Sequence, residues 1–185
     1  MEELSKHIEE NWSNAIMLID RKIIDEIYAF SFFVYDHEDD PRCPTVTMGY
    51  NTYSNLQKQI NNASDEAEAK WNYAFWLQNE IAVIGNEKDE LGKLLIGNWI
   101  SQLGLNYTDQ EDEENYVLCG EKGEKISEQF IKILIEIVKN SHLNELTNKP
   151  ILIHELEYYD RIKNQNIEAN GIERVKEFSN WIDDM

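Results

Sequence analysis

A short segment near the carboxyl end of the chain combines several side chains that could do chemistry. Residues 154–160 read HELEYYD, with one histidine, two glutamates, two tyrosines and an aspartate. In the zinc peptidase motif, two histidines four residues apart on a helix bind the metal, and a glutamate follows the first. Tyr158 stands where that second histidine would be. The segment therefore lacks the motif, and we predict no metal site and no cofactor.

The segment fits a β-strand better than a metal-binding helix. Side chains alternate between the two faces of a strand, which places His154 on the same face as Leu152 and Leu156. We interpret His154 as a histidine of the hydrophobic core. An alternative stays open, in which a small ligand or a substrate enters a pocket near Trp71, Trp76, His154 and Glu157.

Acidic side chains are the strongest feature of the composition. The chain has 36 Asp and Glu against 17 Lys and Arg, so its formal net charge is −19. Two dense clusters contain Asp36, Glu38, Asp39 and Asp40, and Asp109, Glu111, Asp112, Glu113 and Glu114. Neither cluster has the glycine that the calcium-binding loop needs at its sixth position. We expect either solvated loops that keep the protein soluble, or a negative surface that binds a basic protein partner.

The same charge argues against several other classes of protein. A surface of this sign repels nucleic acids and anionic lipids, so neither is an expected partner. No apolar segment approaches the length of about 20 residues that crosses a bilayer. The first ten residues are polar and acidic, unlike an export signal, and the cysteines Cys43 and Cys119 form no metal-binding pair. We therefore expect a cytoplasmic protein.

The pattern of apolar residues predicts one α+β domain that spans residues 1–185. Segment 27–36, IYAFSFFVYD, is apolar on both faces and is typical of a central strand that is covered on both sides. The expected sheet is largely antiparallel and contains residues 27–36, 45–50 and 151–159. Helical periodicity predicts packing helices over 3–19, 87–103, 128–142 and 171–183, with His142 at a helix end.

Three further segments are harder to assign. Residues 71–84 fit a helix or a strand, and we favour a helix that ends before Gly85. The acidic stretch 106–115 indicates a charged loop. The glycines in CGEKGEK, residues 119–125, indicate a turn after a short strand, because they lack the spacing of a phosphate-binding loop.

Several stretches, taken in order, resemble bacterial domain-of-unknown-function family 4303. They are IYAFSFFVYD, the pair Asn51 and Thr52, AKWNYAFW, PILIHELEYYDRIKNQNIEANG and the closing EFSNWI. The resemblance covers about residues 24–181, and its motifs contain no catalytic signature. The sequence NTYSN replaces the acidic helix start of the family.

The resemblance implies an immunity protein that neutralises a cognate toxin, such as a basic nuclease, and it supplies no site residues. Together with the acidity it predicts a non-enzymatic binding protein whose two acidic clusters contact the partner. A small-ligand-binding protein or an enzyme, which would use the alternative pocket, is the second hypothesis.

Overall fold

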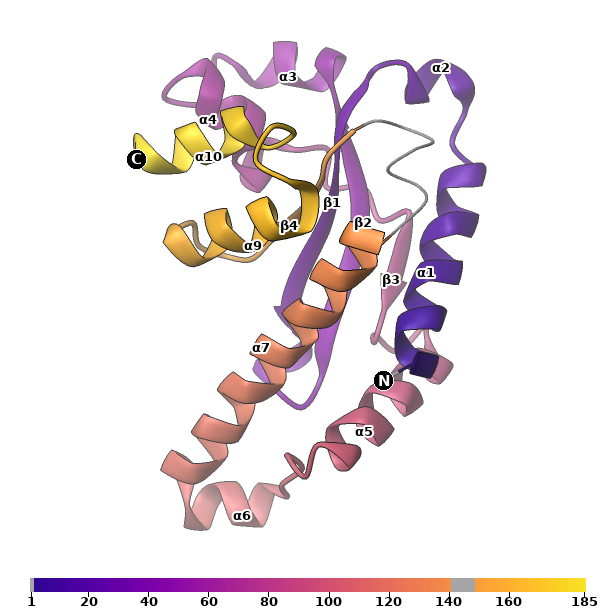
Figure 1. The fold of residues 1–185 in the computed structure, drawn as a ribbon, viewed down its shortest axis with the longest axis vertical. Helices are drawn as coiled ribbons and strands as arrows, with labels where there is room; N and C mark the ends of the chain where they lie inside the picture. Colours follow the sequence, from indigo (N-terminus) through magenta and orange to yellow (C-terminus); the bar gives the residue numbers. More distant parts are fainter. Residues whose placement is uncertain (1, 141–148) are drawn as a thin grey trace.

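The computed structural model describes residues 2–140 and 149–185, and it confirms the α+β class (Figure 1). The predicted end of a helix at His142 lies outside the described residues. The elements are α1 (Glu2–Met17), α2 (Arg21–Ile24), β1 (Ile27–Asp36), η1 (His37–Asp39), β2 (Pro44–Thr52), α3 (Tyr53–Gln59), α4 (Glu66–Trp71), η2 (Tyr73–Phe75), β3 (Ala82–Ile84), α5 (Glu90–Gln102), α6 (Asp109–Glu114), α7 (Tyr116–Asn140), β4 (Ile151–His154), α9 (Asp160–Asn170) and α10 (Lys176–Asp183).

The sheet is largely antiparallel, as predicted, with one parallel strand pair. Its strand order is β3-β2-β1-β4. Strands β1 and β2 form an antiparallel hairpin with Phe32 opposite Met48, and β3 continues the antiparallel pairing. Strand β4 instead runs parallel to β1, with Ile153 opposite Phe32. The chain can return in the parallel direction because the long helix α7 carries it from one end of the sheet to the other.

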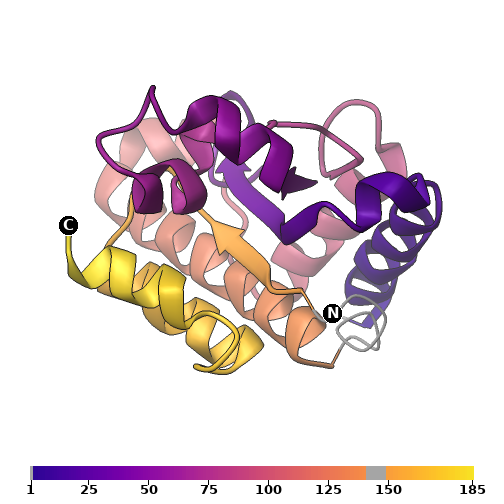
Figure 2. The same ribbon diagram turned by 90° about the horizontal axis from the view of Figure 1, so that it is seen from above.

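Hydrophobic cores lie on both faces of the sheet, as the apolar pattern of 27–36 predicts. One core joins α1, α5 and α7 to β1, where the Trp12 ring meets Phe30 and Phe32 edge-on at 5.1 Å. The other core joins α3, α4, α9 and α10 and is rich in aromatic rings. Figure 2 shows α1 and α10 on opposite sides of the sheet. A bulge near Tyr28 turns this ring toward the second core.

Two asparagines of α9 complete the hydrogen bonding of the edge strand β4. The Asn170 amide accepts a hydrogen bond from Ile151 N and donates one to Ile151 O, both at 2.9 Å. The Asn166 amide does the same for Ile153, at 2.8 and 2.9 Å. Because the asparagines are four residues apart, they lie on one face of the helix and act like a neighbouring strand. Because the backbone groups of Ile151 and Ile153 are already hydrogen-bonded, this edge is protected against pairing with a strand of another chain.

Strand β4 is shorter than the predicted 151–159, because the chain turns after His154. The Glu155 carboxylate binds Arg161 at 2.6 Å, and the Tyr158 hydroxyl folds back to the His154 ring at 2.9 Å. The following helix, α9, is absent from the prediction. Polar residues, including Gln165 and Asn166, occupy buried positions of this helix. The sequence therefore lacks the apolar periodicity that predicts a packed helix.

The middle of the chain also differs from the predictions. Residues 71–84 do not form one helix: α4 ends at Trp71, η2 follows, and β3 begins at Ala82. The loop predicted over 106–115 instead contains α6 at 109–114, and the turn predicted over 119–125 is wrong, because that segment lies within α7. Gly123 has a packing role within α7, since a Cβ there would lie 2.9 Å from Cβ of Pro41.

The remaining predicted helices form with shifted starts. The helix expected over 87–103 begins at Glu90, because the Asp89 side chain accepts a hydrogen bond from Gly92 N and caps it. The helix expected over 171–183 begins at Lys176. The helices expected over 3–19 and 128–142 correspond to α1 and to the second part of α7.

Candidate functional site

The two acidic clusters lie next to each other in the structure, although some 70 residues separate them in the sequence. Arg42 joins them: its Nη2 lies 2.7 Å from Asp40 Oδ2 and 2.7 Å from Asp109 Oδ1. Its Nη1 donates to Tyr107 O at 3.3 Å, and the guanidinium lies 5.0 Å from the centre of the Tyr107 ring. The hydrogen bond from Arg42 lowers the pKa of Asp40. We call the nine predicted carboxylates, joined in this way, the acidic surface.

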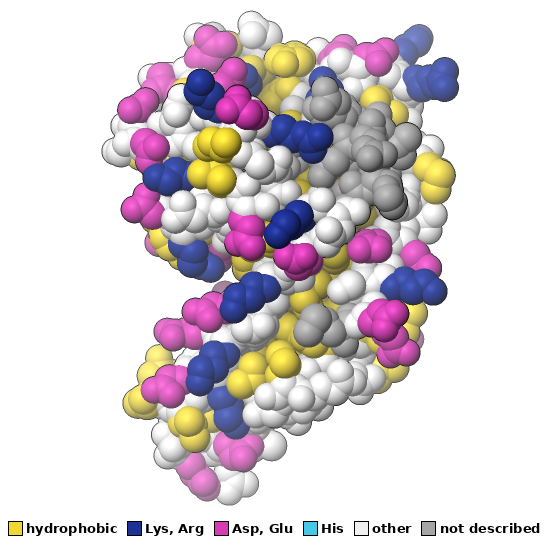
Figure 3. Space-filling model, in the orientation of Figure 1, with side chains coloured by type: hydrophobic (Ala, Val, Ile, Leu, Met, Phe, Trp, Pro, Cys, Tyr) yellow, Lys and Arg dark blue, Asp and Glu magenta, His cyan; other side chains and the backbone are white. Residues whose placement is uncertain are grey.

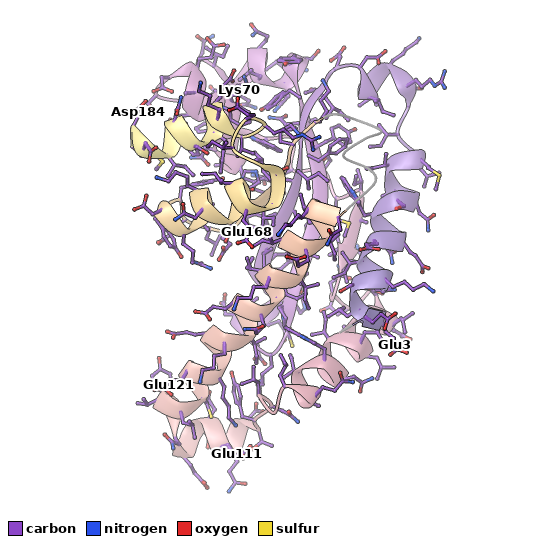
Figure 4. All side chains as sticks on the ribbon, in the orientation of Figure 1. Glu3, Lys70, Glu111, Glu121, Glu168 and Asp184 are labelled. Carbon is purple, nitrogen blue, oxygen red and sulfur yellow. The ribbon has the colours of Figure 1, made fainter. Side chains whose placement is uncertain are left out.

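The acids of α6 differ in how they are held, and the Glu114 carboxylate accepts a hydrogen bond from Gln110 Nε2 at 2.8 Å. Glu111 forms a capping box with Thr108, and the hydrogen bonds from Thr108 lower the Glu111 pKa. Asp109 is held by Arg42. Glu113 and Glu114 are exposed, so their charges face solvent. Figure 4 shows Glu111 at the lower end of the molecule, away from Lys70 and Asp184 at the upper end.

Exposed apolar side chains follow the acids of α6 directly. Tyr116, Val117 and Leu118 at the start of α7 are 77%, 70% and 47% exposed. We call these three residues the apolar corner. The buried positions of α7 begin at Cys119 and continue with helical spacing through Gly123 and Ile126, a pattern that is recognisable only once this segment is known to be helical. The apolar corner therefore falls outside the buried face.

A pocket opens where the parallel strands β1 and β4 end. We call it the end pocket. It has a volume of about 220 Å³, and Asp36, Glu155, Glu157, Ser127, Tyr35 and Tyr159 contribute to its lining. Burial raises the pKa of Asp36, and the carboxylates of Asp40, Glu155 and Asp39 raise it further. The pocket thus extends the acidic surface, and the sequence could not show that Glu155 and Glu157 join it.

His154 lies one residue before this pocket but in a closed environment. Its side chain is fully buried, and the rings of Trp76, Tyr73 and Phe178 lie 4.9, 5.3 and 5.9 Å from its centre. The Tyr158 oxygen lies 2.9 Å from His154 Nδ1 and accepts a hydrogen bond from Tyr73 N. Burial lowers the pKa of His154 to about 3. At neutral pH this imidazole is uncharged and packed into the second core.

The four residues of the alternative pocket do not converge on one cavity. Trp76 and His154 are in contact, as described above. Trp71 contacts Phe178 rather than His154, with ring centres 6.0 Å apart. Glu157 is exposed and lines the end pocket. Trp71, Trp76 and His154 therefore all lie in the second core, and Glu157 lies outside it.

One trio of described residues has the composition of a metal site. Potential ligand atoms of His37, Glu38 and Glu87 lie within 4.8 Å of one another. Both carboxylates are exposed, and a hydrogen bond of 2.9 Å between His37 Nε2 and Glu87 Oε1 accounts for their proximity. We assign no ion to this trio.

Comparisons with known proteins found no matching family model, no matching curated protein and no matching solved structure. The resemblance to family 4303 therefore stays a prediction. Within residues 2–140 and 149–185, no helix has the length and apolar character needed to cross a membrane.

Proposed function

We propose that this chain is a non-enzymatic protein that binds a basic protein partner through the acidic surface. The observation that carries the proposal is the pair of Arg42 contacts, which hold Asp40 and Asp109 together. Through these two contacts Arg42 holds the two acidic segments, which are far apart in the sequence, next to each other. A fixed cluster of like charges attracts an oppositely charged partner more strongly than the same charges dispersed over a surface.

The apolar corner supports the proposal independently of charge. Exposed charges mainly raise the rate of association, whereas buried aromatic and apolar contacts supply most of the binding energy. Tyr116 and Val117 offer such contacts immediately beside Glu113 and Glu114. The combination suits a partner that presents Lys and Arg around an apolar patch.

The resemblance to family 4303 extends this proposal to the identity of the partner. We infer that the partner is a toxin domain encoded by an adjacent gene, such as a basic nuclease, in the cytoplasm. The protein would neutralise the toxin by covering the positive surface that contacts the toxin's substrate. This mechanism needs only complementary surfaces and no catalytic residue in this chain.

Co-expression with the product of the adjacent gene tests the proposal. The test variant carries Glu38→Lys, Glu113→Lys and Glu114→Lys, which avoids the residues that Arg42 and Thr108 hold. The control carries Glu2→Lys, Glu3→Lys and Glu9→Lys on α1, where these side chains are also exposed. Three reversals of two charges each take both variants from −19 to −13. We expect the control to rescue growth and to retain the partner in a pull-down, and the test variant to fail in both.

Equal rescue by both variants would show that the acidic surface does not bind the partner. Circular dichroism of the two purified variants would show whether each is folded. Failure of the control alone would place the interface on α1 and would also contradict the proposal.

A further inference from the structure

A groove lies on the surface between α7 and α9, next to the end pocket. It has a volume of about 580 Å³. Its lining includes Ile131, Ile135, Arg161, Gln165 and Glu168, and Ile131 also lines the end pocket. Figure 3 shows the surface hollowed between α9 and the lower part of α7, with apolar side chains in the depression. The two cavities are therefore neighbours that share Ile131, and we call them together the channel.

Two of the three carboxylates that line the end pocket have no positively charged partner among the described residues. Glu155 is paired with Arg161, and its second oxygen accepts a hydrogen bond from Gln165 Nε2 at 3.1 Å. Among the residues that the structure describes, no Lys or Arg forms an ion pair with Asp36 or Glu157. Two uncompensated carboxylates beside an apolar floor favour a ligand that supplies a cation.

One residue that lines the groove has a hydrogen-bond acceptor without a donor. Gln165 is 5% exposed, and its Nε2 is directed at Ile153 O and at Glu155. Its Oε1, on the other branch of the planar amide, has no partner within the described part of the chain. Buried amide oxygens almost always accept a hydrogen bond, so this atom has a hydrogen-bonding requirement that the described residues do not meet.

We propose that the groove binds a peptide segment of the basic partner, with an arginine side chain in the end pocket and an apolar side chain over Ile131 and Ile135. This inference rests on the proposed function and names the group that the partner inserts. Arginine fits better than lysine, because its planar guanidinium can bind two carboxylates at once and can stack on a ring such as Tyr35.

Titration of the full chain with two synthetic peptides tests the inference. The first is acetyl-Leu-Leu-Arg-amide, and the second replaces arginine with citrulline, which has nearly the same shape but no charge. Methyl NMR spectra report on Val34, Ile131 and Ile135, which lie along the channel. We expect saturable shifts at these methyl groups, with the arginine peptide binding at least about tenfold more tightly than the citrulline peptide.

A pair of matched variants locates the arginine. Asp36→Asn with Glu157→Gln removes two charges from the end pocket, and we expect about tenfold weaker binding of the arginine peptide. Glu2→Gln with Glu9→Gln removes two exposed charges from α1, away from the channel, and should leave peptide binding unchanged. Equal affinity for both peptides, or shifts outside the channel, would overturn the inference. If the peptides bind as expected but the protein does not capture the adjacent gene product, the proposed function is contradicted. The assignment of the groove as a peptide-binding site would still be supported.

Discussion

The surroundings of His154 and those of Glu155 differ completely, although the two residues are adjacent at the end of β4. His154 is closed in by aromatic rings, and its low pKa keeps it neutral. Glu155 faces the end pocket, where it meets Arg161 and a group of further carboxylates. The alternation of a strand thus separates side chains that look like one chemical site in the sequence. Access to solvent, more than residue type, decides which region can meet a partner.

Replacing His154 should have the largest effect on stability. His154→Ala leaves a cavity among the rings of the second core, and we expect the free energy of unfolding to fall by about 3 kcal/mol. Urea denaturation measures this change. The control Glu157→Ala, three residues along, should change stability by no more than about 0.5 kcal/mol, as is usual on a surface. Equal losses of stability from the two substitutions would contradict the conclusion that His154 is packed in the core while Glu157 lies on the surface.

Acid should destabilise the protein through the same histidine. The folded-state pKa of His154 is lowered from 6.5 to about 3, so the unfolded chain takes up its proton first. The stabilising effect is complete above pH 6.5 and is lost as the pH falls from there toward about 3. At pH 5 we expect a loss of about 2 kcal/mol from this residue.

Comparison with His154→Phe isolates this contribution from the many carboxylates. The variant has no imidazole to protonate, so its stability relative to the wild-type chain should increase steadily below pH 6.5. A constant difference between the two proteins from pH 7 to about pH 4 would mean that water reaches His154.

Arg42→Gln should loosen the acidic surface with a smaller cost in stability. The substitution removes both ion pairs that join Asp40 to Asp109. The guanidinium is partly exposed, so we expect a loss of about 1 kcal/mol and faster hydrogen exchange in α6. Arg21→Gln, which removes an exposed charge from α2, is the control. Unchanged exchange in α6 would show that Arg42 does not hold the two clusters together.

Asp36→Asn should stabilise the chain slightly. Burial and three neighbouring carboxylates raise the Asp36 pKa, so its ionisation disfavours the folded state. We expect a gain of no more than about 0.5 kcal/mol at pH 7, since the group is partly exposed. The gain should vanish at low pH, where the aspartic acid is also neutral. A loss of stability at pH 7 would indicate a cation partner for Asp36 within the folded chain.

The sequence predicted the elements whose apolar pattern is regular. Strand β1 and helix α1 follow such patterns, and both formed where expected. Helix α9 was missed because Asn166 and Asn170 use its inner face for hydrogen bonds to β4. The first half of α7 was missed because the glycines Gly120 and Gly123 are typical of a turn. In the structure, Gly123 lacks a side chain where Pro41 packs closely against the helix.

The acidic residues of the candidate site were identifiable from the sequence, but their arrangement was not. The contact of Arg42 with Asp109 joins distant segments, and no local pattern encodes it. The parallel pairing of β4, which places Glu155 beside Asp36, is likewise a property of the whole fold. The apolar corner could have been inferred only once α7 was known to be one helix.

The association rate with the adjacent gene product, measured at about 50 mM and about 500 mM salt, tests the central claim most directly. We predict that the variant carrying Glu38→Lys, Glu113→Lys and Glu114→Lys associates at least about tenfold more slowly at low salt, with a weaker dependence on salt. His154→Phe should stay within about twofold of the wild-type rate at both concentrations. Wild-type rates for the charge-reversed variant, together with a loss of binding in His154→Phe, would contradict the account.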